Sequence, residues 1–179
     1  LDFDNLTEEN IYVLDSPILT NSQFKKFKKF FSKKIKVIDC TFDIEKSLKE
    51  RIELIREEAE TAVREGSTCL ILSDKNISNQ KASIPSILTV GAVHSHLVKH
   101  ALRGYCSLNV ECSDTMDTHS FAILIGVGAT TVNPYLAIDS IYQRFEKKLF
   151  GKSDFETCVA KFKKSIDAGL LKIMSKMGI

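Results

Sequence analysis

The sequence lacks three features that mark whole classes of protein: a long apolar run, a surplus of one charge and closely spaced cysteines. No apolar run reaches the ~18 residues that a membrane-spanning helix needs, and the acidic start LDFDNLTEEN is unlike a signal peptide. The formal net charge of +2 gives no general attraction to nucleic acid or to a membrane surface. We therefore expect neither to be a partner of this chain.

The five cysteines lack the clustered spacing of an iron–sulfur site. Their number is odd, and Cys40, Cys69 and Cys106 lie in or beside apolar runs that are typical of strands. Buried free thiols in a reducing cytoplasm explain this distribution better than a disulfide framework. Because no cysteine has a visible activating partner, we expect no thiol nucleophile, and we expect a cytoplasmic protein.

What the sequence does contain is ordinary for a globular domain. Hydrophobic residues make up 44% and charged residues 27% of a 179-residue chain, which is long enough for a real core. Seven lysines lie between Lys25 and Lys36, mostly on the opposite side of a predicted helix from Phe24, Phe27 and Phe31. We interpret them as a solvated face, because no aromatic or arginine side chains interleave on the lysine side.

Short apolar runs alternate along the chain with segments of helical periodicity. We expect strands at residues 11–14, 35–40, 69–72, 105–111 and 122–127, with helices that begin near residues 22, 43, 85, 135 and 154. This alternation predicts an α/β fold, with a mostly parallel sheet of about five strands and helices on both faces. That number is too small for a closed barrel, so we expect an open sheet or a partial, TIM-barrel-like arrangement.

Local signals predict where the helices begin and end. Asp43 is expected to cap a long helix, and Gly104 is expected to end the helix that begins near residue 85. The latter helix is nearly all apolar over residues 84–93, so we expect it to be among the most buried. Gly91, in the middle of this helix, is less favourable to helix formation than alanine. Close approach of another backbone is the usual reason for such a glycine, and we expect that reason here.

Polar residues stand where the predicted strands end, namely Asp39, Ser73, Asp74, Glu111 and Asn133. In open parallel sheets ligands bind outside the carboxyl ends of the strands, so these residues line the place where a pocket is expected. Such residues also serve as turn and cap residues. Without a general base, a nucleophile elbow or a metal cluster they form no recognisable active site. We expect no catalytic or cofactor-binding residue in this chain.

Three of the four histidines, His94, His96 and His100, fall on one predicted helix. His96 and His100 are one turn apart, so one face could offer two ring nitrogens to a metal. A catalytic zinc helix would normally carry a glutamate beside the first histidine, whereas Leu97 stands there. Positive charge also suits the last turn of a helix. We interpret these histidines as structural and expect no metal; the place of His119 stays open.

Residues 126–131, from Gly126 to Thr131, read GVGATT after a predicted strand. A glycine-rich turn with hydroxyl groups can cradle a phosphate on its backbone N–H groups. A dinucleotide-binding fingerprint would need glycine or alanine where Thr131 stands. We therefore favour close packing of this segment against a neighbour. The alternative is an independent phosphate-binding α/β protein.

Several segments together resemble the central domain of the glutamate synthase large chain. They are residues 16–19 (SPIL), 41–43 (TFD), 70–74 (LILSD), 84–97 (IPSILTVGAVHSHL), 107–111 (SLNVE), 119–137 (HSFAILIGVGATTVNPYLA) and 167–179 (DAGLLKIMSKMGI). The resemblance implies a rudimentary relative of a flavin barrel that has no cofactor of its own. It also implies that the strand-end residues, together with Pro134 and Tyr135, lie near the neighbouring active region.

The same resemblance implies a larger parent enzyme. That parent would take the amide nitrogen of glutamine in an amidotransferase domain and use it to aminate 2-oxoglutarate in a domain with FMN and an iron–sulfur cluster. NADPH, through a small subunit, or ferredoxin would supply electrons. The missing initiator Met and the match at the C-terminal end lead us to expect an excised piece. We expect a domain over residues 1–166 and a helical junction over 167–179. We also expect Gly169 to divide the last helical segment into two helices.

Overall fold

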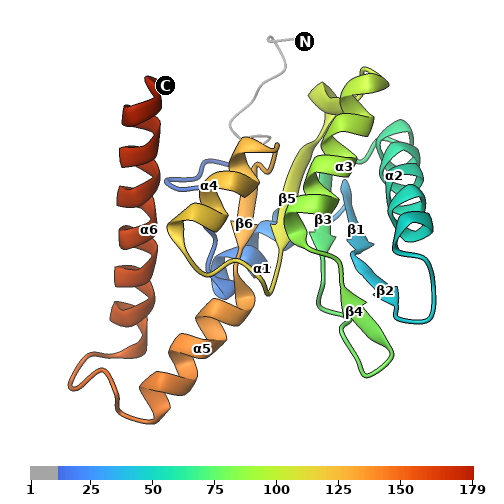
Figure 1. Cartoon of the computed structure of the whole chain (residues 1–179). Coiled ribbons are helices and arrows are strands. Elements are labelled where there is room, and N and C mark those ends of the chain that lie inside the picture. The colour runs from blue at the N-terminus through green and yellow to red at the C-terminus, as the bar shows by residue number, and fades with distance from the viewer. Residues whose placement is uncertain (1–11) are drawn as a thin grey trace.

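A four-stranded parallel sheet forms the centre of the computed structural model, which describes residues 12–179 (Figure 1). The strands lie in the order β1 (Ile35–Asp39), β3 (Cys69–Ser73), β5 (Ser107–Glu111) and β6 (Thr131–Asn133). Each pairs with its neighbour in parallel, and on the outer side of β6 residues 17–19 add an isolated parallel bridge between Ile18 and Val132. Within the described residues β1 remains an open edge. This confirms the predicted α/β class with an open, mostly parallel sheet.

The central strand β3 explains why the sheet needs helices on both faces. All five of its residues are buried. Ile71 packs with Phe24 and Phe27 of α1 (Asn21–Phe30), whereas Leu70 and Leu72 point into a larger core on the other face. An uninterrupted apolar run fits a strand that is covered on both faces.

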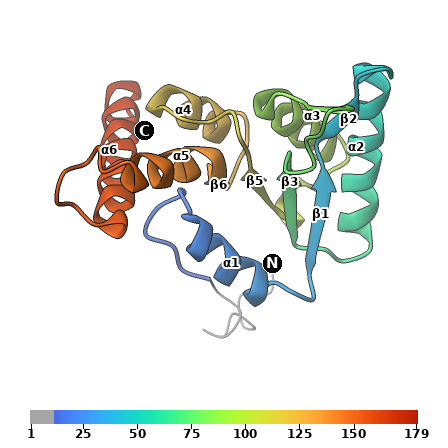
Figure 2. The ribbon, with the colours of Figure 1, turned by 90° about the horizontal axis from the view of Figure 1, so that it is seen from below.

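The other helices surround the sheet as Figures 1 and 2 show. α2 (Leu48–Arg64) and α3 (Ser86–Lys99) cover the face opposite α1. Beyond β6 lie α4 (Thr118–Gly126), α5 (Tyr135–Glu146) and α6 (Phe155–Met177). The predicted helices on both faces are thus confirmed. Among the described residues, none of the helices combines the length and apolarity needed to cross a membrane.

Two of the five predicted strands are absent from the described structure. Residues 122–127 lie almost wholly in α4, whose N-terminus is capped by Asp117, which accepts a hydrogen bond from Ser120 N. Periodicity alone cannot tell whether a short apolar run is a strand or a helix. Here the N-terminal cap at Asp117 favours the helix. The last strand is instead β6, after this helix. Residues 12–14 are irregular, and residue 11 lies outside the described residues.

The predicted starts and ends of two helices are also corrected. Asp43 belongs to β2 (Thr41–Asp43), which pairs antiparallel with β4 (Lys81–Ser83), and α2 begins later, after its cap Ser47. α3 ends at Lys99 because the backbone turns into the left-handed region at Ala101, with φ of 56°. Gly104 lies in the following 3-10 turn, η3 (Arg103–Tyr105).

α3 is less buried than its composition predicts. Ile87 and Leu88 are 45% and 41% exposed, although Val90 and Val93 are fully buried. A Cβ built on Gly91 would meet no described atom within 4 Å, so no backbone approaches it there. The predicted reason for this glycine is therefore wrong within the described chain.

α6 runs unbroken through Gly169, so the predicted split into two helices is wrong. The boundary that we expected between residues 166 and 167 falls inside this helix. A Cβ on Gly169 would lie 2.5 Å from Thr118 Cγ2 at the start of α4. This glycine lets α4 and α6 approach each other instead of ending a helix.

Candidate site at the carboxyl ends of the strands

Glu111, the last residue of β5, is only 3% exposed and binds three side chains. Its Oε1 lies 2.9 Å from Lys28 Nζ and 3.0 Å from Lys75 Nζ, and its Oε2 accepts a hydrogen bond of 2.8 Å from the Ser73 hydroxyl. Burial alone would raise the pKa of Glu111. The hydrogen bonds from Lys28, Ser73 and Lys75 outweigh burial and hold the pKa below its usual value.

Asp74 and Tyr135 lie next to this group. Asp74 Oδ2 accepts hydrogen bonds from the Ser113 backbone N–H (2.9 Å) and hydroxyl (2.6 Å), while Oδ1 has no hydrogen-bond partner within the described structure. Burial, and then the Asp74 carboxylate, raise the pKa of Tyr135 well above its usual value. Lys75 Nζ lies 5.0 Å from the centre of the Tyr135 ring, so Lys75 links the two groups.

The other predicted strand-end residues lie beside this cluster but make separate hydrogen bonds. In the sheet, Asp39 is in register with Ser73, and Asn133 is in register with Glu111. Asn133 is 1% exposed, and its amide nitrogen donates to Leu19 O (2.9 Å) and Asn21 Oδ1 (3.0 Å), which fastens the chain before α1 to β6. Pro134 directly precedes α5. Asp39 accepts hydrogen bonds from the Thr41 backbone N–H and hydroxyl. These residues have structural partners, and none is free to hold a ligand through those atoms.

The cluster is a network of ion pairs and hydrogen bonds that joins α1 to the ends of β3 and β5. Both oxygens of Glu111 are occupied. The hydroxyls of Ser73 and Ser113 donate to carboxylates, not to a histidine. Two hollows of ≈ 610 and ≈ 620 Å³ are lined by other residues, the first between α2 and α3 and the second between α1, α5 and α6. The described geometry therefore supports a structural role.

Sequence reasoning missed Lys28 and Lys75 as members of this cluster. Lys28 was assigned to a solvated face, yet it is only 34% exposed and reaches across to Glu111. Only Lys75 could be connected with the cluster from the sequence, because it directly follows Ser73 and Asp74. No signal in the sequence pairs Lys28 with Glu111, 83 positions away.

The loop of residues 126–131 follows α4, not a strand. Its Thr130 Oγ1 accepts a hydrogen bond from Leu108 N, and Thr131 Oγ1 donates to Asn109 Oδ1, both in β5. Gly128 has a φ of 118°, and a Cβ there would overlap the ring of His94. The hydroxyl groups point into the fold, so the loop is held by close packing and does not present them to a phosphate.

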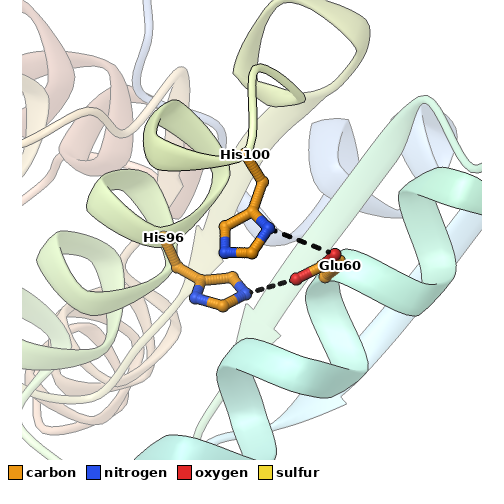
Figure 3. A group of neighbouring side chains, drawn as sticks. All are labelled: Glu60, His96 and His100. Atoms are coloured by element: carbon orange, nitrogen blue, oxygen red, sulfur yellow. Dashed lines mark hydrogen bonds and ion pairs between the residues drawn. The ribbon is translucent and has the colours of Figure 1, made fainter.

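The histidines separate into different surroundings. His94 accepts a hydrogen bond of 3.1 Å from Arg103 Nε and packs on Gly128. His96 and His100 face Glu60 of α2, as Figure 3 shows. His119 lies in α4 and is outside that group. The carboxylate that the sequence lacks beside His96 is therefore supplied by Glu60 of the facing helix.

The cysteines are free and mostly buried, as the sequence predicts. All five cysteines are free, and Cys40, Cys69, Cys106 and Cys112 are buried. Burial raises the pKa of Cys40 and of Cys112 to about 12 and that of Cys69 to about 11. A thiol that stays protonated at neutral pH is a poor nucleophile.

The model of the glutamate synthase central domain matches residues 3–179. The chain belongs to this family. It is 46% identical over 176 residues to the glutamate synthase [NADPH] large chain of Azospirillum brasilense, covering 97% of this chain and 12% of that one. For the corresponding large chain of Bacillus subtilis the identity is 40% over 172 residues, covering 93% and 11%.

A third relative of this central-domain chain is the ferredoxin-dependent glutamate synthase of Pyropia yezoensis, 38% identical over 182 residues and covering 93% of this chain and 12% of that one. The chain therefore spans only 11–12% of the length of these curated relatives. Among solved structures, DHODH from Eimeria tenella, in complex with ferulenol, superposes with a TM-score of 0.50 at 14% identity. That match covers 81% of this chain and 35% of DHODH, and it shows the fold alone.

Proposed function

We propose that this chain is the non-catalytic connecting domain of a glutamate synthase large chain. The parent enzyme would make glutamate from glutamine and 2-oxoglutarate, an oxidoreductase reaction of ammonia assimilation. The observation that supports this most directly is the family match over residues 3–179. The strand-end cluster agrees with it, because its charged and hydroxyl groups bind one another and tie elements of the fold together.

The parent would supply the chemistry from its other parts. We propose an amidotransferase domain and an FMN-binding domain with an iron–sulfur cluster as covalent neighbours. A small NADPH-oxidising subunit would be a further partner if NADPH is the electron donor. The buried, reduced cysteines favour the cytoplasm as the location. The named relatives include both NADPH and ferredoxin-dependent enzymes, so either donor fits the family.

The groove between α2 and α3 is the surface that fits a neighbouring domain best. It has a volume of ≈ 610 Å³ and is lined by apolar residues of both helices, among them Ile52, Ile87 and Leu88. The charged residues Lys49, Glu53 and Arg56 of α2 also line it. Ile87 and Leu88 are 45% and 41% exposed, whereas Val90 and Val93 of the same helix are fully buried. Exposed apolar surface of this kind marks an interaction surface.

Two experiments test the proposal. Reading the gene beyond the codon for Ile179 should reveal a continuation into an FMN-binding domain with clustered cysteines; a stop codon there would contradict the proposal. In the full-length parent, Leu88→Asp should lower glutamine-dependent glutamate synthesis relative to glutaminase activity and to ammonia-dependent synthesis. The substitution would disturb the contact between this domain and its neighbour, whereas the glutaminase and synthase active sites would stay intact. Leu54→Asp on α2, at an exposed position (54%) outside the groove lining, is the matched control and should leave this ratio unchanged.

A further inference from the structure

Two histidines of α3 and a glutamate of α2 meet where these helices pack together (Figure 3). His96 Nε2 lies 2.6 Å from Glu60 Oε2, and His100 Nδ1 lies 3.4 Å from Glu60 Oε1. The two imidazole rings stack with centroids 4.4 Å apart and planes at 30°. One ring nitrogen from each histidine and one carboxylate oxygen lie within 4.8 Å of one another.

We propose that Glu60, His96 and His100 form a binding site for a divalent transition-metal ion, with Zn²⁺ as the best match. Two imidazoles and one carboxylate, with a fourth position left to water, are a ligand set that zinc accepts. Metal–ligand distances of about 2.0–2.2 Å in a tetrahedral site place the ligand atoms about 3.3–3.6 Å apart. The present separations reach that range by small rotations of side chains.

The site is supported by rigid elements. His96 lies in the last turn of α3 and His100 is the C-cap residue one turn further on, so their rings share one side of the helix. Glu60 comes from α2, whose Ala59 is fully buried in the common core. Two packed helices hold three ligands more precisely than a loop would.

The ligands are accessible to an ion from solvent. The side chains of Glu60 and His96 are each 20% exposed and that of His100 is 35% exposed. Partial exposure leaves room for a water ligand and lets the side chains adjust. An ion here would link α2 to α3 beside the groove proposed above as an interface, but the site does not depend on that proposal.

Arg64 carries a positive charge close to Glu60 and would repel a bound cation. Its guanidinium lies 2.8 Å from Glu60 Oε1, one turn along α2, and its side chain is 56% exposed. Oε2, the oxygen that faces His96, has no part in that contact. Arg64 can therefore keep Oε1 and orient the carboxylate while Oε2 binds the metal, as outer-shell partners do in known metal sites.

Titration of the untagged, chelator-treated chain with Zn²⁺ alone tests the proposal, with calorimetry for stoichiometry and Co²⁺ absorption for coordination. We expect one ion per chain, a visible Co²⁺ band typical of nitrogen and oxygen ligands, and a melting temperature that rises with Zn²⁺. His96→Gln, His100→Gln and Glu60→Gln should each weaken binding by about tenfold or more. Glu57→Gln on α2 and His119→Gln on α4, both exposed and outside the cluster, should leave it unchanged.

The absence of Zn²⁺ uptake by the wild-type chain would overturn the proposal. So would uptake that persists undiminished in both histidine variants, because the ion would then sit elsewhere. His100→Gln guards against a trivial loss through misfolding, since His100 is the most exposed of the three ligands. Its far-UV circular dichroism and metal-free melting temperature should match those of the wild type.

Discussion

Lys28 of α1 and Glu111 of β5 form an ion pair of 2.9 Å across 83 positions of sequence. This pair fastens α1 to the carboxyl end of the sheet, where α/β proteins commonly bind ligands. Together with Lys75 and Ser73 it occupies both oxygens of Glu111. The usual binding edge is thus used to hold the fold together.

Replacing Glu111 by glutamine should destabilise the chain by about 1–3 kcal/mol. The amide keeps the size of the side chain but cannot neutralise Lys28 and Lys75. The cost stays moderate because both lysines are partly exposed and can return to water. Urea unfolding at pH 7 measures the difference. Glu57→Gln, at an exposed site, should change the free energy of unfolding by less than about 0.5 kcal/mol.

The contribution of Glu111 should disappear in acid. Its pKa is lower in the folded than in the unfolded state, so its stabilisation is complete above the unfolded pKa of about 4.3 and is lost as pH falls through the lower folded pKa. The difference in unfolding free energy between wild type and Glu111→Gln should be constant from about pH 7 to pH 5 and shrink below about pH 4. A difference that grew on acidification would show that the sign is wrong.

The sheet could be predicted from the sequence because its strands are marked locally. The predicted segments 35–40, 69–72 and 105–111 correspond to β1, β3 and β5, whose apolar runs are bounded by turn residues. The strand predicted at residues 122–127 is wrong because an apolar stretch of that length is compatible with either a buried strand or a buried helix. The three-residue strands β2 and β4 give no apolar signal and form by pairing with each other.

The side-chain clusters could not be predicted, because their members are brought together only by the fold. Glu60 and His96 are 36 positions apart, and the sequence around His96 shows no carboxylate. The zinc-helix pattern requires a carboxylate on the same helix as the histidines, whereas the proposed third ligand, Glu60, lies on the facing helix α2. Likewise, the strand-end rule found Ser73, Asp74 and Glu111 but could not find Lys28.

Gly128→Ala should destabilise the chain by about 2–5 kcal/mol, because it adds backbone strain at a φ of 118° and overlaps the His94 ring. Gly126→Ala is the control two positions earlier: it ends α4, no described atom lies within 4 Å of its Cβ position, and alanine there should be neutral or stabilise by up to ~1 kcal/mol. Denaturant midpoints measure both. Adding His94→Ala should recover only part of the loss, since the backbone strain remains; a full recovery would contradict the strain argument.

Gly169→Ala should destabilise the chain by about 1–2 kcal/mol, even though alanine is the better helix former. Its new methyl group would lie 2.5 Å from Thr118 Cγ2 and 2.8 Å from Thr118 Oγ1, so α4 and α6 would be pushed apart. Gly91→Ala makes the same change within α3, where no described atom lies within 4 Å, and it should stabilise by about 0.5–1 kcal/mol. Thermal unfolding of the two variants should therefore shift in opposite directions.

Thr118→Ala completes this test, because it removes the two nearest atoms that the new methyl group would meet and leaves only Thr118 Cβ, 3.2 Å away. On the Gly169→Ala background it should restore stability, whereas alone it should be neutral or mildly destabilising, so the two changes should show a favourable coupling in a double-mutant cycle. Thr118→Ser keeps Oγ1 at 2.8 Å and should restore less. If Gly169→Ala instead raised the melting temperature as Gly91→Ala does, the glycine would have no role in the contact between α4 and α6.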